Sequence, residues 1–450
     1  MKASYLLSFI ALFGIYNANA QRAFTLADAF IYANKNSYLL ETSALEIEKA
    51  RKQIQEITAI GLPQISAGAD YNYSPQIPQQ PIPAIFFDPD AAEGEFITVG
   101  FGVAHSSTAS LQLNQLIFDG TYLLARQGSI LFKEIKKDEL TKARAEVRDA
   151  VAKSYFNVQL AVEAQKVLED NIESLSKNLK DVQALYESGF VEEQDAEQLE
   201  YLVNGLKLDA DNAKRNKILA EKVFKFTIGM PLDSGVVLTQ SLEQLYFQNV
   251  SGQAITTQNF DLSNHIEYQI VENQEVGASL QLRRTKWAYA PTVNGFISHS
   301  QSNFNDQSFN LVDFNSYWIP ATVMGFSINL PLFTSMARPA RVAQAKIDLQ
   351  EVQIAKEQVG ESLLLEYERA KSDYVYALER VQNEIRNREI TKRIRDKTLI
   401  KFGEGISSSL DVTQAQNQYL NTESNFLSAA LGLLNAKSRL DKVLGNYNTL

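Results

Sequence analysis

Hydrophobic positions change their spacing several times along the first quarter of this chain. Residues 26–60 carry apolar side chains at helical spacing, follow a capping-box pattern from Thr25 to Asp28, and stop before Pro63. From Gln64 to Ser74 apolar and polar side chains alternate, which predicts a strand with one face of each kind. A strand with lipid on one side and water on the other requires this alternation.

The next stretch divides into a loop, a second strand and a very long helix. Residues 75–108 hold five of the eleven prolines, which predicts a long loop, and residues 109–118 alternate again. Residues 122–188 contain no proline, and at 1.5 Å per residue such a helix would be about 100 Å long. Apolar residues at 4-3 spacing within it predict a coiled-coil seam. The seam consists of Leu168, Ile172, Leu175, Leu179, Val182 and Tyr186.

The turn that follows this helix recurs in the second half of the chain. The stretch from Gly189 to Asp195 has the same glycine-to-aspartate interval as the stretch from Gly405 to Asp411, 216 positions later. The same offset carries Gly229 onto Gly445 without a gap. We therefore interpret the chain as a tandem duplication, with each turn at the tip of a long helical hairpin.

Each half of the duplication has the same predicted order of elements. The first half, residues 21–231, ends with a return helix at 195–226, and residues 232–261 form a connector that we expect to pack against the middle of the helices. The second half, residues 262–450, repeats the plan. Its predicted elements are a helix at 262–289, strands at 292–300 and 321–333 around a polar loop at 301–317, a proline-free helix at 341–401 behind Pro339, and a return helix at 410–444.

The N-terminus and the composition bear on where the protein works. Met1-Lys2, an apolar run up to Tyr16 and then Ala18-Asn19-Ala20 predict a signal peptide at residues 1–20. A transmembrane anchor is the less favoured alternative, because the run is shorter than the roughly 20 residues of a spanning helix. The chain has no cysteine, so neither a disulfide nor lipidation at the cleavage site is possible. A net charge of −10 argues against nucleic acid as a partner, and the three histidines are too dispersed for a metal cluster.

Four amphipathic strands are too few to form a closed membrane barrel. The smallest membrane barrels need about eight strands. No window after the signal peptide offers 18 consecutive apolar residues, which a spanning helix would require. If the protein enters a membrane, we expect strands from several copies to close one barrel in a cyclic oligomer.

These features together resemble the TolC-type outer membrane efflux proteins of Gram-negative bacteria. The most specific parts are the tip from Gly405 to Gln414, the strand entry Leu62-Pro63 and the strand exit Leu332-Phe333. The resemblance implies a mainly α fold with membrane β-strands, in which a homotrimer forms a 12-stranded β-barrel in the outer membrane, continued by a periplasmic α-helical barrel. It also implies a passive exit duct for efflux or type I secretion. Its partners would be outer-membrane lipid, a periplasmic adaptor and an inner-membrane RND or ABC transporter, and it would need no catalytic residue, cofactor or metal.

The tip of the second hairpin holds the main candidate for a pore constriction. Asp411 fits a capping box with Ser408, a structural role in which it also complements the helix dipole. The resemblance implies that an aspartate here lines the closed periplasmic end of the tunnel. Three such carboxylates around one axis would repel one another, raise one another's pKa and attract multivalent cations. Both roles can hold together.

Several positions depart from the pattern of the best-known member of this family. Gln414 stands where that pattern has a second aspartate. Phe402 and Ser407 stand where a tyrosine and an arginine tie the gate shut, so we expect the closing interactions here to differ. The candidates for the constriction are Asp411, Gln414, Phe402 and Asp195.

Both tips are also predicted to form the surface on which an adaptor docks. Gly189 and Gly405 are expected to supply the positive φ of each turn. The acidic side chains of the first tip either supply replacement acceptors for the gate or form a solvated acidic turn. The docking candidates are Gly189, Gly405, Glu192, Glu193 and Ser408.

Two aromatic pairs and the overall function leave alternatives open. Trp287-Ala288-Tyr289 and Tyr317-Trp318 lie at strand entries, where they suit either an aromatic girdle at the lipid interface or packing among helices. The alternative function is that of an exported coiled-coil or pore-forming interaction protein that never enters the outer membrane. A periplasmic adaptor would have one hairpin flanked by small β domains, and the duplication argues against it. The sequence does not indicate the transported substrate.

Overall fold

The computed structural model describes residues 22–250, 260–305 and 317–445. The predicted signal peptide and most of the predicted loop at 301–317 lie outside these ranges. The chain divides into two compact units: unit 1 consists of residues 1–46, 137–271 and 356–450, and unit 2 of residues 47–136 and 272–355. Each unit therefore takes segments from both halves of the duplication.

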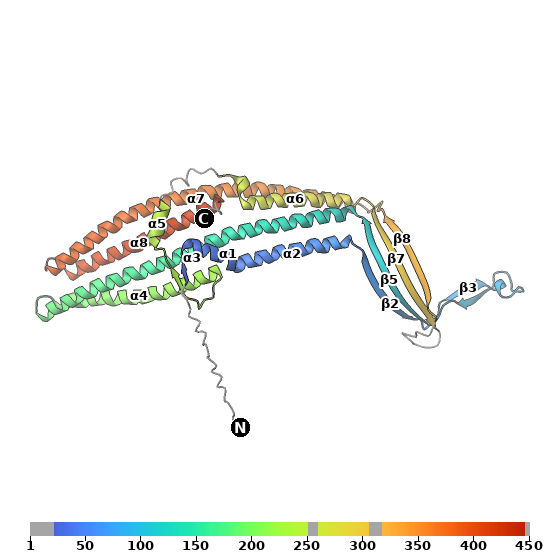
Figure 1. Ribbon diagram of the computed structural model, residues 1–450, viewed down its shortest axis with the longest axis horizontal. Coiled ribbons are helices and arrows are strands. Elements are labelled where there is room, and N and C mark those ends of the chain that lie inside the picture. The colour runs from blue at the N-terminus through green and yellow to red at the C-terminus, as the bar shows by residue number, and fades with distance from the viewer. Residues whose placement is uncertain (1–21, 251–259, 306–316, 446–450) are drawn as a thin grey trace, which may run out of the picture. The chain divides into compact units, whose positions relative to one another are not determined.

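Two long helical hairpins lie mainly in unit 1, and the first part of α3 and of α7, up to residues 136 and 355, belongs to unit 2. The first consists of α3 (Gly120–Glu187) and α4 (Glu193–Ile228), and the second of α7 (Ala337–Gly403) and α8 (Ser409–Val443). The two helices of each hairpin lie side by side and are joined by a short turn (Figure 1). The hairpins predicted from the duplicated turn are therefore confirmed. The helix predicted at 262–289 is α6 (Ile266–Trp287), preceded by the short helix η3 (Leu262–Asn264).

The core of unit 1 lies where both hairpins pack together. Tyr155 of α3, Phe224 of α4, Tyr374 of α7 and Leu433 of α8 are each at most 1 % exposed and belong to one apolar cluster. Full burial of side chains of this size stabilises the fold by roughly 1.5–3 kcal/mol each. The cluster therefore anchors the two hairpins to each other far from their tips.

Smaller apolar clusters continue this packing toward the tips. Leu175 of α3 is buried against α4, and Val182 packs with residues of α4 and α8 nearer the turns. The seam predicted from Leu168 to Val182 is confirmed. Its last predicted member, Tyr186, is 41 % exposed, because α3 ends one residue later and the chain turns away.

The connector at 232–261 packs into the core of unit 1. Strand β6 (Val236–Leu238) pairs in parallel with β1 (Arg22–Phe24), and α5 (Leu242–Val250) buries Leu242 and Leu245 in the main cluster. The sequence analysis expected this packing but assigned neither short strand. A parallel pair of three residues per strand leaves no periodic pattern that could reveal it.

The single helix predicted at 26–60 is wrong, because α1 (Leu26–Asn36) and α2 (Tyr38–Ile60) are separate. Ser37 between them has an extended backbone with ψ of 128° and is buried. At this break the Asn36 carbonyl approaches Gly229 so closely that a Cβ there would lie 1.9 Å from the oxygen. The break therefore lies against the C-cap of α4. The capping box predicted at Thr25 is present.

Unit 2 holds a four-stranded antiparallel sheet in the order β2-β5-β7-β8 (Figure 1). The strands are β2 (Gln64–Tyr73), β5 (His105–Phe118), β7 (Thr292–Asn305) and β8 (Ile319–Asn329). All four predicted strands exist. Their bounds differ from the prediction, since β5 begins earlier, β7 continues into the predicted loop and β8 ends before the Leu332-Phe333 exit.

The pairing register collects the apolar side chains on one face of the sheet. Ile65, Leu113, Ile297 and Met324 form one row across the four strands, as successive partners in the ladders. Side chains directly opposite in a ladder point to the same face, so this apolar row crosses all four strands, and His299 and Gln301 of β7 lie on the same face.

The proline-rich stretch at 75–108 is not a simple loop, which corrects the prediction. Strands β3 (Gln79–Pro83) and β4 (Phe96–Gly100) pair as an antiparallel hairpin, with the short helix η1 (Ala84–Phe86) at its end. Each strand of such a hairpin has one open edge, where a proline without an N–H is tolerated. The alternation was hidden by the prolines. Separately, no described helix is both long enough and apolar enough to cross a bilayer.

Candidate functional site at the hairpin tips

The two tips share one backbone conformation. The amides of Gly189 and Phe190 each donate to a carbonyl in the last turn of α3 at 2.9 Å, and the amides of Gly405 and Ile406 repeat this in α7 at 3.0 and 2.8 Å. This is the Schellman motif, which needs a left-handed residue directly after the helix. Gly189 and Gly405 have φ of 78° and 73°, so the predicted positive φ is confirmed at both tips.

The second tip holds Asp411 in a complete capping box. The Asp411 carboxylate accepts hydrogen bonds from the Ser408 amide at 2.9 Å, the Ser408 hydroxyl at 2.8 Å and the Ser407 hydroxyl at 3.1 Å. The Asp411 amide in turn donates to the Ser408 hydroxyl at 3.2 Å. These bonds, first of all the one from the Ser408 backbone, hold the pKa of Asp411 below its ordinary value. The predicted cap is therefore present, and the carboxylate remains exposed to solvent.

The first tip lacks this side-chain cap. Glu192 occupies the N-cap position of α4 with an extended backbone, but its side chain accepts no hydrogen bond from the helix. Glu193 and Asp195 lie in the first turn, where their charge complements the partial positive charge of the helix N-terminus. Glu192 and Glu193 are exposed and Asp195 is half-buried, so the first tip is an acidic turn.

The remaining predicted residues divide between the surface and the interior. Gln414 is exposed one turn after Asp411, whereas Phe402 is half-buried and packs against a cluster that contains Leu199 of α4 and Val412 of α8. The Ser409 hydroxyl of α8 donates to Gln198 of α4 at 3.0 Å. The structure thus brings the two tips together, with Asp411 and Gln414 on the outside of the contact and Phe402 inside it.

Sequence reasoning missed an exposed apolar residue at each tip. Phe190 is 78 % exposed and Ile406 is 70 % exposed, and each directly follows the glycine of its turn. The duplication places them at equivalent positions. The repeat was the signal that could have revealed this pair.

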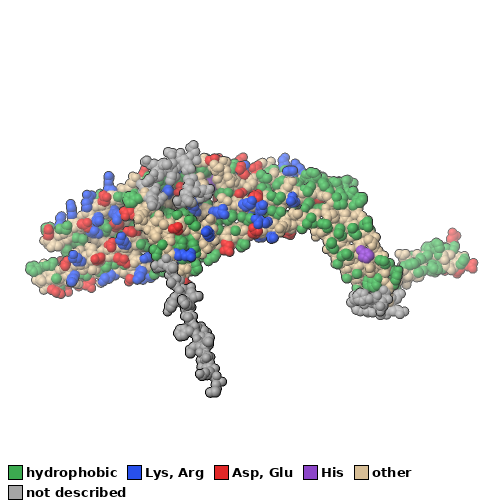
Figure 2. All heavy atoms as spheres, in the orientation of Figure 1, with side chains coloured by type: hydrophobic (Ala, Val, Ile, Leu, Met, Phe, Trp, Pro, Cys, Tyr) green, Lys and Arg blue, Asp and Glu red, His purple; other side chains and the backbone are tan. Residues whose placement is uncertain are grey.

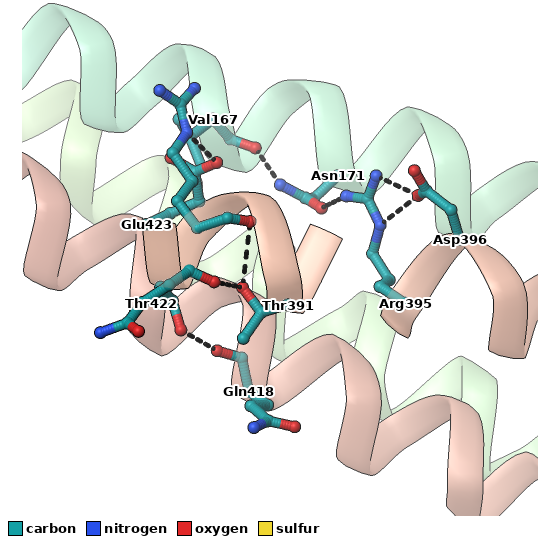
Figure 3. A network of polar contacts seen from close by, with 10 residues as sticks. Val167, Asn171, Thr391, Arg395, Asp396, Gln418, Thr422 and Glu423 are labelled. Atoms are coloured by element: carbon teal, nitrogen blue, oxygen red, sulfur yellow. Dashed lines mark hydrogen bonds and ion pairs between the residues drawn. The ribbon is translucent and has the colours of Figure 1, made fainter. Parts of the chain in front are cut away.

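Sequence reasoning also missed a buried polar network that joins the two hairpins (Figure 3). The Asn171 side chain of α3 accepts a hydrogen bond from Gln416 of α8 at 2.7 Å and one from the Arg395 guanidinium of α7 at 3.3 Å. Its own amide donates to the Val167 carbonyl at 2.6 Å. Asn171 and Gln416 are 5 % and 1 % exposed, so these bonds fix the register of the second hairpin against α3.

The network continues along α8 through a buried carboxylate. Glu423 is 2 % exposed and accepts a hydrogen bond from Arg388 at 2.8 Å. Tyr419 lies under the Arg395 guanidinium, 4.1 Å from its ring centroid, and burial together with Glu423 raises the pKa of Tyr419 to about 12. Tyr419 therefore remains a neutral phenol at physiological pH. These polar residues interrupt the apolar seam, which is why a search for periodic apolar positions passes over them.

The aromatic residues predicted at strand entries are partly packed. The Trp287 ring lies so close to Gly120 that a Cβ there would be 2.2 Å from it, yet Trp287 is 45 % exposed. Tyr289 lies beneath the Arg338 guanidinium at 5.4 Å, and Tyr317 is 80 % exposed. Trp287 thus combines helix packing with an exposed edge, and the girdle assignment stays a prediction.

The duplicated architecture of paired amphipathic strands and long helical hairpins is that of a TolC-like channel protein. The profile of the family described as outer membrane efflux protein matches residues 32–221 and 256–446, which is most of the chain and falls on both halves. The chain therefore belongs to the outer membrane efflux protein family, and the resemblance predicted from the sequence is confirmed.

Solved structures of similar fold agree with this assignment. The chain is similar to CusC (16 % identity, TM-score 0.71), covering 93 % of this chain and 91 % of that one. It is also similar to VceC of Vibrio cholerae (14 %, TM-score 0.68, 93 % and 96 % covered) and to the CmeC outer membrane channel of Campylobacter jejuni (18 %, TM-score 0.69, 93 % and 85 % covered). No curated protein matches the sequence. The family assignment makes this chain an outer membrane efflux protein and not an enzyme.

Proposed function

We propose that this protein is the passive exit duct of a tripartite efflux or type I secretion system. As a homotrimer it receives substrate from an inner-membrane RND or ABC transporter and a periplasmic adaptor. Residues 1–20 are its signal peptide, and the mature N-terminus carries no lipid. One observation carries the proposal: large apolar side chains form an exposed row across one face of the sheet, and among the described residues its edge strands β2 and β8 each pair on one side only.

The four strands are incomplete as they stand in one chain. Among the described residues β2 and β8 each pair on one side only, while Ile65, Met324 and Phe326 on the apolar face are about 70 % exposed. Strands of 10–14 residues suit a bilayer, which a tilted strand spans in about 9–11 residues. Pairing β8 of one copy with β2 of the next removes both edges, and three copies supply the 12-stranded barrel.

A charge on either side of β5 tests this placement. Leu111 lies on the apolar face and its neighbour Gln112 on the polar face of the same strand. Leu111→Arg should impair insertion, at a cost of roughly 2–4 kcal/mol per arginine at the bilayer midplane, whereas Gln112→Arg should be tolerated. The measurement is the amount of heat-modifiable trimer in outer-membrane fractions. Normal levels of both variants would contradict a lipid-facing position of Leu111, and a defect in Gln112→Arg alone would mean that the faces are reversed. Absence of heat-modifiable trimer from wild-type outer-membrane fractions would favour an interaction protein outside the membrane.

We further propose that the two tips form the adaptor-docking surface, with Asp411, Gln414 and Asp195 at the constriction beside it. Exposed Phe190 and Ile406 support this, because both are large apolar side chains at the end of the molecule where a partner would meet them. A photo-crosslinking residue at Ile406 should capture a periplasmic adaptor in living cells. The same residue at Leu365, which is 71 % exposed in the middle of α7, is the control. Capture at Leu365 and not at Ile406 would contradict tip docking.

A further inference from the structure

The two hairpins carry opposite charge near their tips. Residues 193–211 of α4 contain six acidic side chains and one lysine, whereas residues 386–401 of α7 contain seven basic side chains and two acidic ones. Lys and Arg side chains line the edge of the molecule formed by α7 (Figure 2). Of the seven basic side chains, Arg388 and Arg395 belong to the buried polar network, whereas the other five do not.

Each charged stripe lies on the side of its helix that faces away from the packed seam. Glu197 is two residues from the fully buried Leu199, which at 3.6 residues per turn places it about 200° around α4. Lys397 is likewise two residues from Leu399 and Arg395, both of which face the interior. The two outward faces therefore do not meet within one chain.

The outward faces have defined members. The acidic face of α4 consists of Glu193, Glu197, Tyr201 and Leu208, and the basic face of α7 consists of Arg386, Ile390, Arg393, Lys397, Ile400 and Lys401. All ten side chains are exposed, Tyr201 to 82 % and Ile400 to 63 %. Within the described ranges, none of the charged members has an ion-pair or side-chain hydrogen-bond partner.

The two faces match in height when they are counted from the tips. Glu193 and Lys401 are both four residues from their turn glycine, Glu197 and Lys397 are both eight away, and Tyr201 and Arg393 are both twelve away. Because α7 ends two residues before Gly405, α4 begins four residues after Gly189 and helices rise 1.5 Å per residue, each pair lies within about 3 Å of the same level in two copies standing side by side.

We propose that the acidic face of α4 binds the basic face of α7 in a neighbouring copy of this chain. Glu193 pairs with Lys401 and Glu197 with Lys397, while Arg393 lies over the Tyr201 ring in a cation–π contact. Each copy offers one face of each kind, so the contact is heterologous and closes into a ring. The level match follows from the duplication within the chain, which favours a second copy over an unrelated partner. The inference rests on the proposed trimer.

Disulfide crosslinking tests the contact directly, because the chain has no cysteine of its own. The variant Glu197→Cys with Lys397→Cys should form covalent dimers and trimers on oxidation in intact outer membranes. A pair that is out of level, Glu197→Cys with Arg386→Cys, is offset by about 16 Å along α7 and should remain monomeric on a denaturing gel. Each single-cysteine variant should also remain monomeric.

The outcomes separate this contact from the proposed function. One outcome is that all variants form heat-modifiable trimers while Glu197→Cys with Lys397→Cys gives no covalent dimers or trimers. This result would overturn the contact and leave the proposed duct function intact. If the wild type forms no trimer, both fail. Crosslinking within one chain, or to a different protein, would also overturn the contact.

Charge exchange gives an independent readout. Glu197→Lys and Lys397→Glu alone should each lower the temperature at which the trimer dissociates in detergent, more so at low salt, and the double exchange should restore it. Failure of the double variant to recover, although it folds and inserts, would contradict a direct pair.

Discussion

The two hairpin tips share one backbone conformation but differ in the side chains that follow the turn. The Schellman bonds and left-handed glycines are equivalent residue by residue, 216 positions apart. The next turn differs: Ser408 and Asp411 form a complete capping box, whereas Glu192 and Asp195 at the same positions do not. Both turns need a glycine because only a residue without Cβ takes this φ at no cost, whereas the cap residues differ between the tips.

This difference assigns distinct roles to the two aspartates. The Asp411 carboxylate accepts three hydrogen bonds from its own chain, so its first role is to stabilise the start of α8. Asp195 forms no such cap, so its carboxylate is not held by hydrogen bonds at the start of α4. A gate built from the second tip is thus held in a fixed orientation, and the first tip supplies a looser acidic surface.

The largest expected effect is a difference in stability between alanine variants of two glycines. Gly229 has no room for a Cβ, whereas Gly189 requires only a positive φ. Gly229 and Gly189 both have φ near 75°, but a Cβ on Gly229 would meet the Asn36 backbone oxygen, while a Cβ on Gly189 would meet nothing within 4 Å. Gly189→Ala should cost about 1–2 kcal/mol, the usual left-handed penalty, and Gly229→Ala clearly more. Thermal unfolding of the two variants in detergent, followed by circular dichroism, measures this. Equal losses would show that Asn36 moves aside.

The next effect contrasts the caps themselves. Ser408→Ala removes the hydroxyl that bonds Asp411 and should destabilise the start of α8 by about 1 kcal/mol. Glu192→Ala removes a side chain that caps nothing, and its effect should stay within about 0.5 kcal/mol. Hydrogen exchange of the first-turn amides in α8 and α4 reports both. Similar changes in the two helices would contradict the assignment of a cap to the second tip alone.

A smaller effect concerns acid. Within one chain the capping bonds hold the pKa of Asp411 below its ordinary value of 3.8, so the contribution of the cap is present above that value and is lost as the pH falls through the folded pKa. Amides at the start of α8 should keep constant protection from pH 7 to about pH 5 and lose it below about pH 4. Asp411→Asn should abolish this dependence. Asp195→Asn, the matched control at the first tip, should leave it unchanged.

The sequence predicted the repeated parts of this molecule and missed the parts that depend on single contacts. Helical hairpins, the four strands and both turn glycines follow from periodicity and from the offset between the halves. The break at Ser37 does not, because it lies at a contact with Gly229, far away in the chain, which a local pattern does not show. The buried pair of Asn171 and Gln416 was missed for a related reason. A polar residue in an apolar seam indicates a hydrogen bond only when its partner is known.

The smallest expected effect asks whether the tip with the ordered cap is also the constriction. In the proposed trimer three Asp411 carboxylates share one axis, where they concentrate trivalent cations. Asp411→Asn should weaken the block of single-channel current by such ions severalfold, and the amide can still accept a hydrogen bond from Ser408, so trimer assembly should be unchanged. Asp195→Asn should weaken the block less, because that side chain is half-buried at the looser tip. Block that survives Asp411→Asn but not Asp195→Asn would move the constriction to the first hairpin and leave Asp411 as a helix cap alone.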